Sequence, residues 1–127
     1  MKKIIIFALV AVMLASGCFA ESIVLKGYPF VRGEGTPEGS SNTSLTDNVS
    51  EEYKVIISKD NGKYYWLSRE NKPLLYSRSG IFHLFVNPDG SGYIKVAERD
   101  GKYLYMEHMS LVFGTVTYWG TAEEFKP

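Results

Sequence analysis

Short apolar runs alternate with turn residues through the second half of the chain, at intervals of roughly ten residues. This spacing is typical of antiparallel β-sheets. After residue 20, no helical periodicity extends over ten residues or more. The expected strands are 53–59, 64–69, 74–77, 81–86, 93–98, 102–107 and 111–119. With a strand near the start of the domain, we predict an all-β fold: a small antiparallel barrel or sandwich of about seven or eight strands.

Turn chemistry separates these runs. Asn61-Gly62 is the strongest short hairpin signal, because both residues tolerate a positive φ. Arg99-Asp100-Gly101 predicts a second tight hairpin, and the segment Asn87-Pro88-Asp89-Gly90-Ser91-Gly92 predicts a longer turn.

The faces of the predicted strands follow from their period of two. Ile94 and Val96 share one face of their strand, and Leu104 and Met106 share one face of the next. We expect these aliphatic faces to point inward. The opposite face would then carry Tyr93, Tyr103 and Tyr105, with Trp66 or Trp119 nearby. Exposed rings of this kind bind sugars or proteins, although tyrosine also suits strands for purely structural reasons.

The region before the compact part divides in two. Residues 21–31 predict an N-terminal strand, whereas residues 32–50 are rich in Gly, Ser, Thr and Asn, with only Leu45 and Val49 large and apolar. Such a segment buries little apolar surface, so we expect a polar linker or loop there. The compact antiparallel domain is expected to span residues 51–127.

Residues 1–20 have the plan of a bacterial signal peptide. Lys2 and Lys3 precede an apolar run over residues 4–15, which is too short to cross a bilayer, and small residues follow. The sequence therefore predicts export to the periplasm or the extracellular space.

Two cleavage sites are compatible with this leader. Cleavage after Ala20 leaves a soluble chain, because Cys18 and Ala20 form an A-x-A-like site. The run Leu14-Ala15-Ser16-Gly17-Cys18 resembles a lipoprotein signal, which implies lipidation of Cys18 and a membrane anchor. Cys18 is the only cysteine, so the domain has no internal disulfide and its stability depends on packing.

Charge and reactive side chains narrow the functional classes. The chain has 14 basic and 14 acidic residues with no basic cluster, which gives no support for nucleic-acid binding. His83 and His108 are the only histidines and show no metal-ligand spacing. No nucleophile motif or facing carboxylate pair is apparent, so we predict no catalytic residue, metal or cofactor.

These observations favour an exported, non-catalytic envelope module that binds a protein or glycan. The expected contacts are Trp66, Tyr93, Tyr103 and Tyr105 on the aromatic sheet face, or else the polar loop. A small periplasmic inhibitor of a secreted hydrolase, acting through residues 87–92, is the first alternative. A small envelope enzyme with His83 or His108 as its base is the second.

Overall fold

The computed structural model describes residues 22–127. The predicted signal peptide, its two cleavage sites and Cys18 lie outside the described residues. Within residues 22–127, no helix has the length and apolar character needed to cross a membrane.

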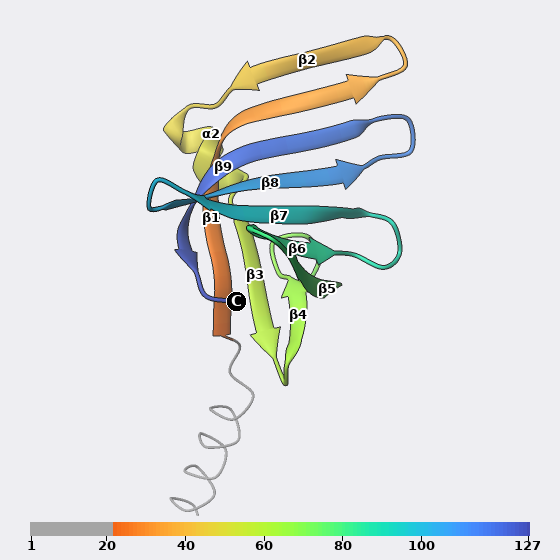
Figure 1. Cartoon of the computed structure of the whole chain (residues 1–127). Helices are drawn as coiled ribbons and strands as arrows, with labels where there is room; N and C mark the ends of the chain where they lie inside the picture. Colours follow the sequence, from red (N-terminus) through yellow and green to blue (C-terminus); the bar gives the residue numbers. More distant parts are fainter. Residues whose placement is uncertain (1–21) are drawn as a thin grey trace, which may run out of the picture.

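The described chain forms a nine-stranded antiparallel sheet, most of which closes into a barrel (Figure 1). The elements are β1 (Ser22–Thr36), β2 (Gly39–Ser44), α2 (Asp47–Glu52), β3 (Val55–Asp60), β4 (Lys63–Trp66), β5 (Lys72–Ser79), β6 (Phe82–Val86), β7 (Gly92–Arg99), β8 (Lys102–Ser110) and β9 (Thr115–Phe125). Strand β1 pairs with both β3 and β9, so eight strands close the barrel and β2 remains outside it. The prediction of an all-β fold is confirmed, in its barrel form.

Strands β1 and β9 are the longest in the barrel and pair along most of their length. The pairing shifts register at Lys26/Gly27 and again at Pro29/Val31. Gly120 on β9 leaves room for the Tyr105 ring, because a Cβ at this position would lie 2.6 Å from that ring. Bulges bend a strand and increase its twist, and these bends allow β1 to pair with both β3 and β9.

Residues 32–50 differ from the predicted polar linker or loop. Strand β1 continues to Thr36, a turn at Pro37-Glu38 follows, and β2 returns along β1 before α2 begins at Asp47. Backbone pairing holds this hairpin, since residues from Arg32 to Gly35 also pair with β9. An exposed outer strand needs no apolar side chains. The polar composition of β2 therefore gives no pattern from which the strand could be predicted.

The last strand is displaced from its predicted position at 111–119. Residues 111–114 form the β8–β9 loop, and β9 continues through the polar tail to Phe125. Phe125 packs at the edge of the core against the rings of Tyr103, His83 and Phe85. The packing of Phe125 therefore stabilises the polar tail as a continuation of β9.

Aromatic and aliphatic side chains fill the barrel. The buried core comprises Val24, Leu25, Val55, Ile57, Trp66, Leu74, Phe85, Ile94, Val96, Tyr105 and Phe125. Side chains at native density leave little space between them, and an eight-stranded barrel is narrow enough to be filled in this way.

Candidate functional site

The predicted tyrosine face is not formed. Strand β7 directs Ile94 and Val96 inward as predicted, but Val96 lies opposite Tyr105 in the β7–β8 register. Residues that pair directly lie on the same side of a sheet, so Tyr105 also points inward and is only 3% exposed. The prediction that the aliphatic face of β8 points inward is therefore wrong.

The four predicted contact residues are divided between the two sides of the barrel wall. Trp66 and Tyr105 are buried, and Tyr103 packs against the core. Tyr93 lies opposite His108 on the outer side, with ring centroids 5.2 Å apart. No single surface presents all four rings.

The outer side of β6 to β9 carries a different apolar set. The side chains are Phe82, Leu104, Met106 and Trp119, which line a shallow hollow of about 330 Å³ together with Lys95 and Ala97. Trp119 covers the backbone of Gly33, where an added Cβ would lie 2.9 Å from the indole. Leu104, Met106 and Trp119 are each partly buried, so much of this surface is already covered by its neighbours.

Glu107 is the most unusual polar residue inside the barrel. Its carboxylate is fully buried and accepts hydrogen bonds from Trp66 Nε1 at 2.7 Å and from Arg69 at 2.8 and 3.2 Å. Burial raises the pKa of Glu107 above its ordinary value, although the Arg69 guanidinium and the Trp66 N–H oppose the shift. No part of Glu107 reaches solvent, and its hydrogen bonds join the β4–β5 segment to β8.

Tyr105 lies in the same part of the interior. Its hydroxyl is buried without a hydrogen-bond partner among the described residues. Burial, with a smaller effect of the nearby Glu107, raises the pKa of Tyr105 far above its usual value. The phenol is therefore neutral at physiological pH and contributes to the core chiefly through its ring.

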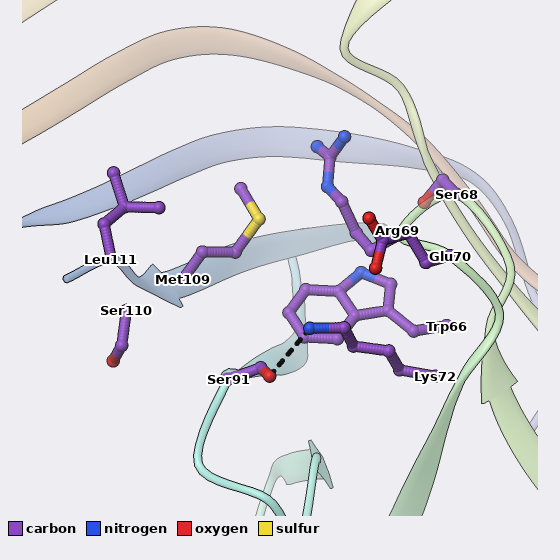
Figure 2. A pocket seen from close by; sticks show the side chains of 9 residues that line it. All are labelled: Trp66, Ser68, Arg69, Glu70, Lys72, Ser91, Met109, Ser110 and Leu111. Atoms are coloured by element: carbon purple, nitrogen blue, oxygen red, sulfur yellow. Dashed lines mark hydrogen bonds between the residues drawn. The ribbon is translucent and has the colours of Figure 1, made fainter.

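A hollow of about 340 Å³ opens beside the Glu107 cluster (Figure 2). It is lined by Trp66, Ser68, Arg69, Glu70, Lys72, Ser91, Met109, Ser110 and Leu111. Lys72 Nζ donates a hydrogen bond to Ser91 Oγ at 2.8 Å across its lower side, and Met109 and Leu111 form its apolar wall (Figure 2). We call this the first hollow, as distinct from the outer hollow lined by Phe82 and Trp119.

The β8–β9 loop presents three consecutive apolar side chains to solvent. Leu111 is 58% exposed, Val112 88% and Phe113 80%. We call these three residues the apolar finger. The loop lies at the end of the β8–β9 pair, on the same side of the molecule as the β1–β2 turn (Figure 1).

Backbone contacts fix the shape of the apolar finger. Leu111 N donates to Gly114 O at 2.8 Å, and Ser110 N donates to Ser91 O at 2.8 Å. Gly114 lies so close to the carbonyl of Gly35 that a Cβ would not fit. The loop is thereby held from both neighbouring turns.

A second hollow of about 300 Å³ is lined in part by Leu111 of the apolar finger. Phe113 and Val116 line it, together with Arg32, Glu34 and Thr36. Arg32 and Glu34 form an ion pair at 2.6 Å, while the first hollow contains Arg69, Glu70 and Lys72. Charges of both signs therefore surround the apolar finger.

The two histidines lie on opposite sides of the barrel wall. His83 points inward, where its Nδ1 lies 2.7 Å from the Tyr76 hydroxyl, and burial lowers its pKa. His108 lies outside, with Nδ1 2.8 Å from Thr117 Oγ1. Within residues 22–127, no three His, Cys, Asp or Glu side chains are grouped to hold a metal ion.

The turn at residues 87–92, expected to act in the inhibitor alternative, is internally bonded. Asn87 is buried, donates from Nδ2 to Pro73 O at 2.9 Å, and accepts from the backbone N–H of Asp89 at 3.0 Å. Ser91 N donates to Asp89 Oδ1 at 2.9 Å. Its polar groups thus stabilise the turn itself.

The apolar finger was not identified from the sequence, because its residues were assigned to the last strand. The available signal was the run Leu111-Val112-Phe113 directly before Gly114, where an apolar run meets a turn residue.

The chain matches no family model, no curated protein and no solved structure.

Proposed function

We propose that the chain is an exported, non-catalytic module that binds a partner protein through the apolar finger. The leader supports export, with the mature chain either released or anchored at Cys18. The observation that carries the proposal is the exposure of Leu111, Val112 and Phe113, each more than half accessible to solvent.

Exposure of three adjacent apolar side chains has a free-energy cost that the fold does not require. Each square ångström of apolar surface left in water forgoes about 25 cal/mol. Single exposed apolar residues are common on protein surfaces, but consecutive ones mark interaction sites. The cost is offset when a partner covers the apolar finger.

The fixed geometry of the loop also favours binding. The hydrogen bonds of Leu111 and Ser110 fix the base of the apolar finger before a partner arrives. A surface that is already shaped loses less conformational entropy on binding than a mobile one.

The surroundings of the apolar finger favour a protein over a bilayer. Protein interfaces have an apolar centre and a polar rim, and here the centre is flanked by the Arg32–Glu34 pair and by Arg69, Glu70 and Lys72. Loops that enter anionic bilayers are surrounded by cations instead, because acidic groups are repelled by the lipid headgroups.

The proposal is tested by capture from the cells that produce the protein. We expect Val112→Glu and Phe113→Glu each to lower recovery of a co-purifying protein at least about tenfold, because a charge would enter an apolar contact. Both residues are exposed, so the free energy of unfolding should change by no more than about 0.5 kcal/mol. Leu75→Glu is the matched control, since Leu75 is 64% exposed and lies on β5.

Three results would contradict the proposal. One is recovery of the same proteins with the Phe113→Glu and wild-type chains. The second is an equal loss with Leu75→Glu, which would indicate non-specific adsorption rather than a site. The third is recovery of lipid alone, which would mean that a membrane and not a protein covers the apolar finger.

The hydrolase-inhibitor alternative is a special case of this proposal. A narrow, preformed loop with an apolar tip suits insertion into a substrate cleft, and that role moves from residues 87–92 to the apolar finger. If the captured protein is a hydrolase, the purified chain should inhibit it, and Phe113→Glu should abolish the inhibition.

A further inference from the structure

Strand β2 forms a free edge of the sheet. It pairs with β1 and, among the described residues, with no other strand (Figure 1). All six of its residues are exposed, and their sequence GSSNTS contains no charge and no proline. Its pairing with β1 has no register shift.

The hydrogen-bonding pattern shows which backbone groups face away from β1. Leu45 N donates to Phe30 O at 2.9 Å, which marks that position as a hydrogen-bonded pair. Such pairs alternate along antiparallel strands, so Arg32–Thr43 and Glu34–Ser41 are hydrogen-bonded as well. The N–H and C=O groups of the intervening β2 residues point outward: those of Ser40, Asn42 and Ser44.

This edge lacks the usual protection against strand addition. Proteins guard edge strands with lysine, proline, bulges or a covering element. Strand β2 has none of the first three, and all of its residues remain exposed beside α2.

We propose, independently of the apolar finger, that the occupant of this edge is β2 of a second copy of the chain. The two strands run antiparallel, with Asn42 opposite Asn42 of the second copy and Ser40 opposite Ser44 of the second copy. This register places every outward N–H opposite an outward C=O around one two-fold axis, as an isologous dimer requires.

The side chains of β2 favour self-pairing. All are small and uncharged, so the two paired strands carry no like charges that would repel each other, and no charge of one sign on β2 selects a different partner. The contact is short, and therefore we expect a concentration-dependent dimer rather than a permanent one.

Sedimentation velocity of the mature chain, measured over a range of concentrations, tests the proposal. The wild type should change from monomer to dimer. Asn42→Pro removes an outward N–H and should raise the dimer dissociation constant at least about tenfold. Asn42→Ala keeps that N–H and should dimerise like the wild type. Equal unfolding temperatures would show that both variants fold.

A charge pair tests the register itself. Asn42→Lys and Asn42→Glu should each weaken self-association about fivefold, because like charges then face each other across the axis. An equimolar mixture of the two should dimerise again. A wild type that stays monomeric at every concentration, an Asn42→Pro chain that dimerises normally, or a mixture that fails to associate would overturn the proposal.

Discussion

Glu107 illustrates what the barrel interior does to a single charge. Its carboxylate is fully buried and bonded to Trp66 and Arg69, yet its pKa is raised, because desolvation outweighs the attraction of the guanidinium. A buried ion pair of this kind adds little to stability, because the cost of desolvating both charges offsets their attraction.

The raised pKa determines how the free energy of unfolding varies with pH. A carboxyl group with a raised folded-state pKa stabilises the fold below its ordinary value of 4.5, and this contribution is lost as the pH rises through the folded-state pKa. We therefore expect the wild type to be most stable, relative to Glu107→Gln, near pH 4, with the difference shrinking toward neutral pH. Urea unfolding of both chains between pH 4 and pH 8 measures this, and a difference that grows with pH would mean that the ion pair dominates.

Single residues also show where sequence reasoning fails. The inward direction of Ile94 and Val96 was predicted correctly, because their strand has one clearly apolar face. Strand β8 has an aliphatic face and an aromatic face, and hydrophobicity alone does not rank them. The register with β7 decides, since Tyr105 lies opposite Val96, and that long-range fact is absent from a local pattern.

At the scale of elements, local turn chemistry was the most reliable guide. Asn61 and Gly62 have φ values of 50° and 76° and join β3 to β4, as predicted. The β1–β2 hairpin was missed because an exposed strand carries no apolar alternation. The end of β9 was missed because its partner, the first half of β1, lies far away in the sequence.

Two phenylalanines near opposite ends of β9 should respond very differently to truncation. Phe125 packs against the core and is 9% exposed, so Phe125→Ala should lower the free energy of unfolding by about 3 kcal/mol. Phe113→Ala, in the apolar finger, should change it by no more than about 0.5 kcal/mol. Chemical denaturation compares them, and similar losses would show that the apolar finger is part of the fold rather than a surface for a partner.

For the whole molecule, the sequence predicted the fold class but not the closure. Barrel and sandwich share the same strands and turns, and they differ in whether β1 meets β9, a contact between the two ends of the described chain. That contact also places the β8–β9 loop beside the β1–β2 turn, so that residues of the apolar finger line two hollows. The position of the candidate site could therefore not be predicted from strand patterns alone.

Site-specific photo-cross-linking tests the central claim most directly. A photoreactive amino acid at Val112, introduced into the full chain in the cells that make it, should form an adduct with one discrete protein. The same group at Leu75, which is also exposed, should not. Adducts of equal pattern from both positions, or adducts with lipid alone at Val112, would contradict the account.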